Sequence, residues 1–218
     1  MRSCSRFTSR FEGSAMPHDE PHLSRPSPQF IQSEVDVAHY GVIRTTVSNF
    51  ISTLATQFDS EGITVLDVAP EAHAGAQASF TRGRIETIDI DPDSAATHIA
   101  DLCVCNCARI PSALYDVIVC TEVLEHTKEP WKATKELRRL LKPGGVLAVT
   151  TPFNFRIHGP APDCWRFTEE GLGVLMAEFI DVRIDAVEDP ERPRMPIQYT
   201  VVARKRLGES ETCWDFQG

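Results

Sequence analysis

The stretch YDVIVCTEVLEHTKEPWKATKELRRLLKPGGVLAVTTP, residues 115–152, decides the fold because a strand, a helix and a second strand follow one another within it. Residues 115–121 and 145–152 are apolar, β-branched runs typical of strands buried on both faces. Between them apolar side chains recur at helical spacing, and Pro143-Gly144-Gly145 ends that helix. This order predicts that the two strands pair in parallel.

The same patterns continue on either side of this stretch. An apolar stripe predicts a helix over 40–58, and an N-cap at Thr168 predicts another from about 169 to 178. Two late strands follow without an intervening helix, which indicates an antiparallel hairpin at the sheet edge. The further strands that we expect cover residues 63–70, 85–91, 97–102, 179–189 and 196–206. The chain is therefore predicted to be an α/β protein with a mostly parallel sheet.

Composition excludes several classes of partner. The 218 residues carry 22 Lys plus Arg against 31 Asp plus Glu, so the formal net charge of −9 opposes binding to duplex nucleic acid or anionic lipid. No apolar run approaches the roughly 18–20 residues that cross a bilayer. We therefore expect a small-molecule substrate, no nucleic-acid partner and no membrane partner, and the oligomeric state stays open.

Cysteine usage and the chain ends bear on location and domain limits. Seven cysteines, several of them in stretches that read as core, favour free thiols in a reducing, cytoplasmic setting. Residues 1–28 lack the apolar stretch of a secretory signal and are expected to be a disordered leader, with a weak organelle transit peptide as the alternative. We expect a single domain over 29–206 with an N-terminal docking helix, and a loose tail over 207–218.

Acidic residues close three successive strands of the predicted sheet. Asp67 closes the first, Asp89 closes the second 22 residues later, and Asp101 follows a short extended piece. Ligands of open parallel sheets bind at the carboxyl ends of the strands, and an acid at this spacing accepts hydrogen bonds from ribose hydroxyls. Asp89 is thereby predicted to bind an adenosine-type ribose; the alternative is a surface acid in a turn.

The first turn indicates which nucleotide is bound. The segment VLDVAPEAHAG holds Asp67 and Glu71 and has no early glycine, so it lacks the amide cradle that a pyrophosphate needs. Negative charge at that place suits a ligand whose tail carries an ammonium and a sulfonium. S-adenosylmethionine is such a ligand, and it is the cofactor that we expect.

In these segments the chain resembles the class I S-adenosylmethionine-dependent methyltransferases, in the small-molecule branch that carries E-V-L-E-H after the fourth strand. The resemblance rests on VLDVAPEAH, ETIDIDP, IADL, YDVIVCTEVLEH and LRRLLKPGGVLAVTTP, in that order. It implies a Rossmann-like seven-stranded, mostly parallel sheet of order 3-2-1-4-5-7-6 with helices on both faces. The cofactor-binding residues that it implies are Asp67, Ala69, Glu71, Asp89, Ile90, Asp101, Leu102 and Thr121.

The chain departs from this family in the first motif. Ala69, Glu71 and His73 occupy the positions where the family has three glycines, and Pro70 restricts the turn further. Two interpretations follow. Either the loop takes another path, with Gly75 supplying flexibility, or cofactor binding has decayed.

Glu122, Glu125 and His126 are expected to open the helix after the fourth strand, where their spacing places them on one face. His126 is the neutral-pH base among them, so we predict His126, Glu122 and His158 as catalytic residues. The alternative is structural: Glu122 would meet the helix dipole, and His126 would satisfy a buried backbone group.

The same residues have a second functional interpretation. Two glutamates and a histidine, with His158 arriving from the loop after the fifth strand, could hold Mg²⁺. This arrangement is similar to metal-using members, namely small-RNA 3′-end 2′-O-methyltransferases and some quinone-ring O-methyltransferases. We nevertheless expect no metal. Asp163, Trp165 and Arg166 lie in the loop that would face the acceptor, and an Asp163–Arg166 ion pair is the alternative to acceptor recognition.

The sequence thus predicts an S-adenosylmethionine-dependent methyltransferase acting on an oxygen or nitrogen of a small polar acceptor. The alternatives are a non-catalytic methyltransferase-like binding protein and a Mg-dependent RNA 2′-O-methyltransferase.

Overall fold

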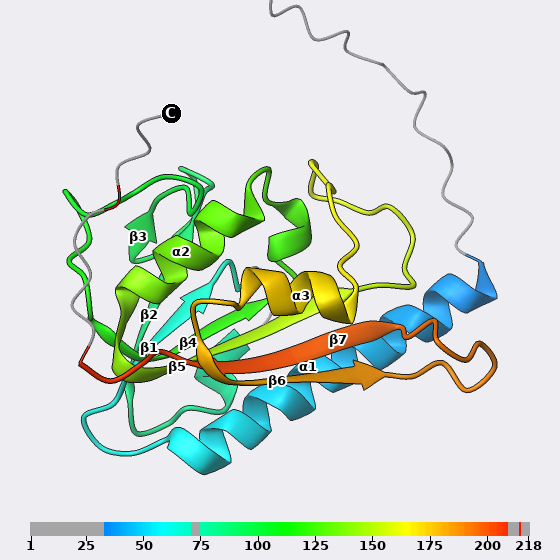
Figure 1. The fold of residues 1–218 in the computed structure, drawn as a ribbon, viewed down its shortest axis with the longest axis horizontal. Helices are drawn as coiled ribbons and strands as arrows, with labels where there is room; N and C mark the ends of the chain where they lie inside the picture. Colours follow the sequence, from blue (N-terminus) through cyan, green and yellow to red (C-terminus); the bar gives the residue numbers. More distant parts are fainter. Residues whose placement is uncertain (1–32, 71–74, 209–213, 215–218) are drawn as a thin grey trace, which may run out of the picture. The chain divides into compact units, whose positions relative to one another are not determined.

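A seven-stranded sheet forms the centre of the computed structural model, which describes residues 33–70, 75–208 and 214 (Figure 1). Its order is β3-β2-β1-β4-β5-β7-β6, and β7 alone runs antiparallel to its neighbours. The strands are β1 (Thr64–Val68), β2 (Arg84–Asp89), β3 (His98–Ile99), β4 (Tyr115–Thr121), β5 (Leu141–Pro152), β6 (Ile180–Val187) and β7 (Gln198–Arg204). The expected Rossmann-like sheet, its order and its edge hairpin are confirmed.

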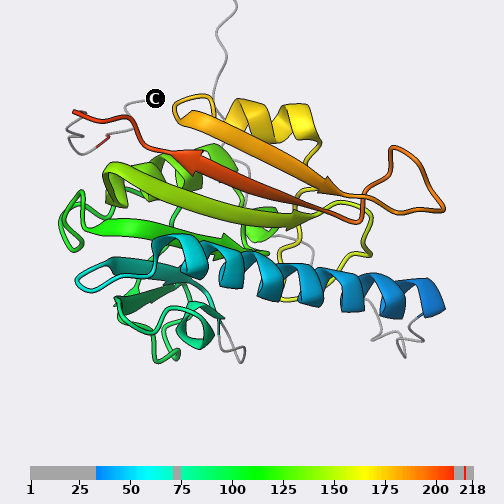
Figure 2. The same cartoon turned by 90° about the horizontal axis from the view of Figure 1, so that it is seen from below.

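Helices cover both faces of the sheet, as predicted. Helix α1 (Glu34–Phe58) lies on one face, while α2 (Pro130–Leu140) and α3 (Glu169–Leu175) lie on the other (Figure 2). Successive strand residues point to opposite faces, so Val117 packs in the α1 layer and Ile118 in the α2 layer. Helix α1 begins before the expected Tyr40, because Ser33 and Asp36 form a capping box at its start.

The segment after β4 corrects a prediction. Glu122 lies in the left-handed region with φ of +55°, and only a 3₁₀ turn, η2 (Leu124–His126), follows. The helix itself starts at Pro130, whose missing N–H suits the first turn. Glu122, Glu125 and His126 therefore do not share a helical face, and no helix dipole meets Glu122.

The cysteine prediction holds in part. Cys103, Cys105, Cys120 and Cys164 are free thiols, whereas Cys107 is disulfide-bonded, so the expectation of a free thiol is wrong there.

Residues 29–32 and the predicted leader 1–28 lie outside the described residues, and so does most of the predicted tail. No helix in the described part of the chain is long and apolar enough to cross a membrane.

A buried ion pair connects α2 to the loop after β3. The Arg139 and Glu136 side chains are fully buried, and Arg139 Nη2 donates to Glu136 Oε1 at 2.7 Å. Glu136 Oε1 also accepts from the Asn106 N–H, and Arg139 Nη1 donates to the Ile110 carbonyl. These contacts fix the loop that carries Asp101 at the edge of the sheet.

Replacing one member of this pair leaves a buried charge without its partner. We expect Arg139→Met to lower the free energy of unfolding by about 3–5 kcal/mol, measured by urea denaturation. The matched control is Arg84→Met, which removes an exposed guanidinium group from its pair with Glu86 and should cost no more than about 1 kcal/mol. Equal losses in the two variants would contradict the role assigned to the buried pair.

Candidate cofactor and acceptor site

The described residues among the predicted cofactor ligands lie at the end of the sheet where the parallel strands have their carboxyl ends, which we call the carboxyl edge. Parallel pairing aligns Val68 of β1 with Ile88 of β2, and Asp89 with Ile99 of β3, so the carboxyl ends of these strands lie side by side. Asp67, Ala69 and Asp89 therefore share this edge, together with Thr121 at the end of β4. Asp101 follows β3 closely.

Asp67 is almost fully buried, at 2% exposure, and accepts a hydrogen bond from the Ala76 N–H at 2.6 Å. Burial raises its pKa to about 6, although the Ala76 hydrogen bond opposes the shift. A Cβ on Gly75 would overlap Asp67 Oδ2. Gly75 thus lets the chain approach the carboxyl group closely.

Ala69, at the first of the three replaced glycine positions, keeps a glycine-type backbone. Ala69 has φ of +46°, and its N–H donates to the Ile88 carbonyl at 2.8 Å. At this first position the chain takes the left-handed conformation that glycine normally supplies. Glu71 and His73 lie outside the described residues.

The remaining predicted cofactor residues differ in how they face solvent. Asp89 Oδ1 accepts from the Asp91 N–H, and Ile90 beside it is 68% exposed. Asp101 Oδ1 accepts from the Cys103 N–H at 2.7 Å. Leu102 is buried in the core, so its side chain stabilises the loop and only its backbone is placed for a ligand.

Glu122 is held by two side chains from neighbouring strands. Its Oε1 accepts from Thr150 Oγ1 at 2.8 Å and from Gln198 Nε2 at 2.6 Å. Burial raises the pKa of this carboxyl group, and the two hydrogen bonds oppose the shift. Thr150 and Gln198 were not found by sequence reasoning, because they belong to strands that only the fold brings next to β4.

The structure brings Glu125, His126 and His158 together. One ligand atom from each lies within 4.8 Å of the others, and the two imidazole centroids are 4.8 Å apart. Glu125 is fully buried, and neither of its carboxylate oxygens has a hydrogen-bond partner among the described residues. Burial raises its pKa well above the usual range, and the nearby Glu122 raises it further.

Hydrogen bonds orient both imidazole rings. His126 Nδ1 donates to the Pro162 carbonyl at 2.8 Å, so in the neutral ring the lone pair is on Nε2, which lies 3.8 Å from Glu125 Oε1. His158 Nδ1 lies 3.2 Å from Asp163 Oδ2 and 3.3 Å from the Arg156 carbonyl, so its proton also belongs on Nδ1. Both Nε2 atoms are therefore left with free lone pairs.

The loop over 156–167 closes onto the η2 turn. The Cys164 and Trp165 N–H groups both donate to the Glu125 carbonyl, and Trp165 Nε1 donates to the Thr127 carbonyl. Arg166 binds Asp163 through two parallel hydrogen bonds. Burial alone would raise the pKa of Asp163, but the Arg166 and His158 hydrogen bonds lower it to about 2. The predicted Asp163–Arg166 ion pair is thus present.

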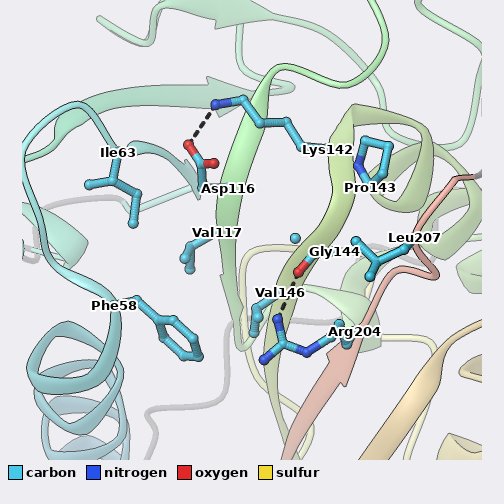
Figure 3. A pocket seen from close by; sticks show the side chains of 11 residues that line it. Phe58, Ile63, Asp116, Val117, Lys142, Pro143, Gly144, Val146, Arg204 and Leu207 are labelled. Carbon is cyan, nitrogen blue, oxygen red and sulfur yellow. Dashed lines mark hydrogen bonds and ion pairs between the residues drawn. The ribbon is translucent and has the colours of Figure 1, made fainter.

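A cavity of about 410 Å³ lies at the opposite edge of the sheet (Figure 3). It is lined by residues at the amino ends of β4 and β5, among them Asp116, which is ion-paired with Lys142. Arg204 and Leu207 approach from the end of β7. None of the predicted site residues lines it, and in open parallel sheets ligands bind at the carboxyl ends.

Comparison with known proteins supports the fold and shows a similarity to methyltransferases. Residues 47–149 match the model of a methyltransferase domain. An uncharacterized methyltransferase of Mycobacterium sp. (strain KMS) is 28% identical over 123 residues, which are 51% of this chain and 48% of the relative. The chain thus spans about half the length of the curated relatives that it matches.

Solved structures share the fold at low identity. The CurJ carbon methyltransferase superposes with a TM-score of 0.60 at 16% identity, covering 79% of this chain and 58% of that one. The cyclase SpnF gives 0.53 at 16% identity, covering 72% and 81%. The strand order and the match over residues 47–149 make this chain similar to the class I methyltransferases.

The left-handed conformation of Ala69 in the first turn can be tested directly by substitution. Ala69→Gly should raise the free energy of unfolding by roughly 0.5–1 kcal/mol, since glycine adopts positive φ without steric cost. Ala113, with φ of +58° and far from the carboxyl edge, provides the matched control Ala113→Gly, which should stabilise by a similar amount. Denaturant titration measures both, and destabilisation by Ala69→Gly would contradict the assigned conformation.

The raised pKa of the buried Asp67 carboxyl group should make the free energy of unfolding depend on pH. The folded state holds this proton more tightly than the unfolded chain, whose pKa is 3.8, so stability is lost as the pH rises from about 4 to about 6. Compared with the Asp67→Asn variant, the native chain should lose on the order of 3 kcal/mol of its free energy of unfolding across that pH window. Above the window little further loss is expected. Urea titrations at several pH values measure the difference, and a constant difference would refute the buried, proton-retaining carboxyl group.

Proposed function

We propose that this chain transfers a methyl group from S-adenosylmethionine to an oxygen or nitrogen of a small polar acceptor. The observation that carries the proposal is the row of acidic groups along the carboxyl edge: Asp67 and Asp89 lie at the ends of β1 and β2, and Asp101 follows β3. Negative charge there favours a cationic cofactor over a dinucleotide pyrophosphate. We also propose a cytoplasmic location and a small-molecule substrate, since the charge of −9 disfavours nucleic acid.

Each strand end receives a role in holding the cofactor. The Asp89 carboxylate accepts the ribose hydroxyls, and the exposed Ile90 side chain covers the adenine ring. Asp101 faces the adenine from the next strand, and the backbone from Leu102 completes that side. Ala69 and Thr121 border the methionine portion, where Asp67 attracts its ammonium group once the carboxyl group ionises.

The arrangement of the two imidazole rings indicates how the methyl acceptor is activated. Methyl transfer is an in-line displacement, so the protein mainly aligns the acceptor and excludes water. His126 Nε2 carries a free lone pair and takes the proton of a hydroxyl or ammonium acceptor, while His158 and Glu122 line the same end of the sheet. The loop over 156–167 supplies the cover.

A non-catalytic binding protein is the second candidate. The replaced glycines of the first motif favour it, and a shared fold does not imply a shared reaction, since the cyclase SpnF has this fold as well. Ala69, however, retains the left-handed backbone, and the acids at the strand ends remain. These features support cofactor binding.

Calorimetry of the full chain with S-adenosylmethionine tests the proposal. We expect binding, and we expect Asp89→Ala to weaken it at least about tenfold, because a carboxylate accepting hydrogen bonds is lost. The matched control Asp91→Ala removes an exposed acid two residues away and should leave affinity unchanged. Absence of binding at high micromolar cofactor, or equal affinity in the Asp89→Ala variant, would contradict the assignment.

A further inference from the structure

One cysteine in the described part of the chain is oxidised, while the others there are thiols. Cys107, in the loop between β3 and β4, is disulfide-bonded, and the remaining described cysteines are free. Its partner is therefore one of the two cysteines that lie outside the described residues, Cys4 and Cys213. Disulfides of reducing compartments are usually transient or redox-sensing, so in the cytoplasmic location that we propose this bond needs a functional explanation.

Trp214, the residue that follows Cys213 in the sequence, contacts helix α2. Its Nε1–H donates to Glu136 Oε2 at 3.1 Å, and Lys135 Nζ lies 5.6 Å from the centre of its ring. A cation over an indole face is attracted by the negative face of the ring. One hydrogen bond and one cation–π contact thus hold Trp214 against α2.

The Trp214 hydrogen bond completes the set of donors around a buried carboxylate. The Glu136 side chain is fully buried, and its Oε1 accepts from the Asn106 N–H and from Arg139 Nη2. Its Oε2 accepts from Arg139 Nε and from Trp214 Nε1. A carboxylate offers about four lone-pair sites, so these donors match its capacity. Trp214 therefore joins a third segment to α2 and to the loop after β3.

The same hydrogen bonds lead to the carboxyl edge. Asn106, whose N–H donates to Glu136, is itself buried, and its Nδ2 donates to the Asp101 carbonyl at 2.8 Å. Cys107 is the next residue in the chain. The disulfide and Trp214 therefore act on one loop, which begins at the acid that we placed beside the adenine ring.

We propose that Cys107 and Cys213 form a redox-modification site. Their disulfide fastens the segment around Trp214 to the loop over 101–110 and so holds the adenine side of the cofactor site. Cys213 is chosen over Cys4 because its neighbour Trp214 is bonded to the carboxylate that holds this loop. The effect on cofactor affinity rests on the proposed methyltransferase function, whereas the disulfide and its effect on the loop do not.

Reduction opens this site by thiol–disulfide exchange. A thiolate of an external dithiol attacks the disulfide and forms a mixed disulfide with one protein sulfur, while the other protein sulfur leaves as a thiolate. The second thiol of the reductant then attacks the mixed disulfide, so the reductant ends as its own disulfide. Two electrons pass to the protein, and Cys107 and Cys213 take up the two protons. The covalent link is lost, so the loop over 101–110 opens more often.

The pairing is measured on the full chain after equilibration with glutathione disulfide, which serves as the oxidant. Remaining thiols are alkylated, and peptides are mapped by mass spectrometry without reductant. We expect a linked pair of peptides that contain Cys107 and Cys213. A bond from Cys107 to Cys4, a bond between two chains, or an alkylated Cys107 would overturn the proposal.

Amide hydrogen exchange measures what the bond does to the loop. Reduction with dithiothreitol should speed exchange at Asn106 and Ile110 at least about tenfold and leave the buried strand residue Val117 unchanged. Cys213→Ser should show the faster exchange with and without reductant. The matched control Cys164→Ser removes an exposed free thiol and should keep the response to reductant. Equal exchange in the oxidised and reduced chains, or a response that persists in Cys213→Ser, would contradict the assigned site.

Trp214 is tested as a positioning residue with a conservative variant. Trp214→Phe keeps an aromatic ring but removes the indole N–H, so it should speed exchange at Asn106 in the oxidised chain while the disulfide still forms. Unchanged exchange at Asn106 would refute this role.

Calorimetry tests the link to the cofactor. The affinity of the full chain for S-adenosylmethionine should fall at least about threefold on reduction, and it should not change on reduction of Cys213→Ser. Equal affinity of the oxidised and reduced chains would overturn the link. Failure of both to bind contradicts the proposed function, and with it the cofactor part of this inference, while the peptide map and the exchange rates still decide the redox site.

Discussion

Parallel pairing of adjacent strands is the constraint on which the site depends. Because β1, β2, β3, β4 and β5 all point the same way, each contributes its carboxyl end to a single edge. Residues scattered over 67–126 in the sequence become neighbours there. An acid that closes a strand is then a group at a shared surface, and the combined negative charge determines which ligands are attracted.

The acceptor side of the site, formed by the η2 turn and the loop over 156–167, is held together by one backbone carbonyl group. Glu125 O accepts the N–H groups of Cys164 and Trp165, which connects the turn after β4 to a loop that lies about forty residues later. This connection brings His158 and His126 together in a T-shaped, edge-to-face contact. The Arg166–Asp163 pair stiffens the same loop from the other side. The acceptor side is therefore held by backbone contacts rather than by a helix.

Apolar periodicity and the alternation of strands and helices predicted the parallel sheet and the edge hairpin, whereas the strand order was implied by the resemblance to the class I methyltransferases. Sequence reasoning placed Asp67, Asp89 and Thr121 at strand ends, as found. It wrongly predicted a helix at Glu122, because a positive φ in a non-glycine residue gives no sequence signal. It also missed the buried carboxyl group of Glu125, which has no hydrogen-bond partner among the described residues, because burial of this kind depends on the folded surroundings.

The central claim is that the carboxyl edge, with its glycine-poor first turn, still holds S-adenosylmethionine. Hydrogen–deuterium exchange of the full chain, with and without S-adenosylhomocysteine, tests it most directly. The account predicts slower exchange at the amides of Ala69, Ala76, Ile90 and Leu102, and no change in the amino-edge segment around Lys142 and Gly144. Protection at the amino edge, or none at either edge, would contradict it.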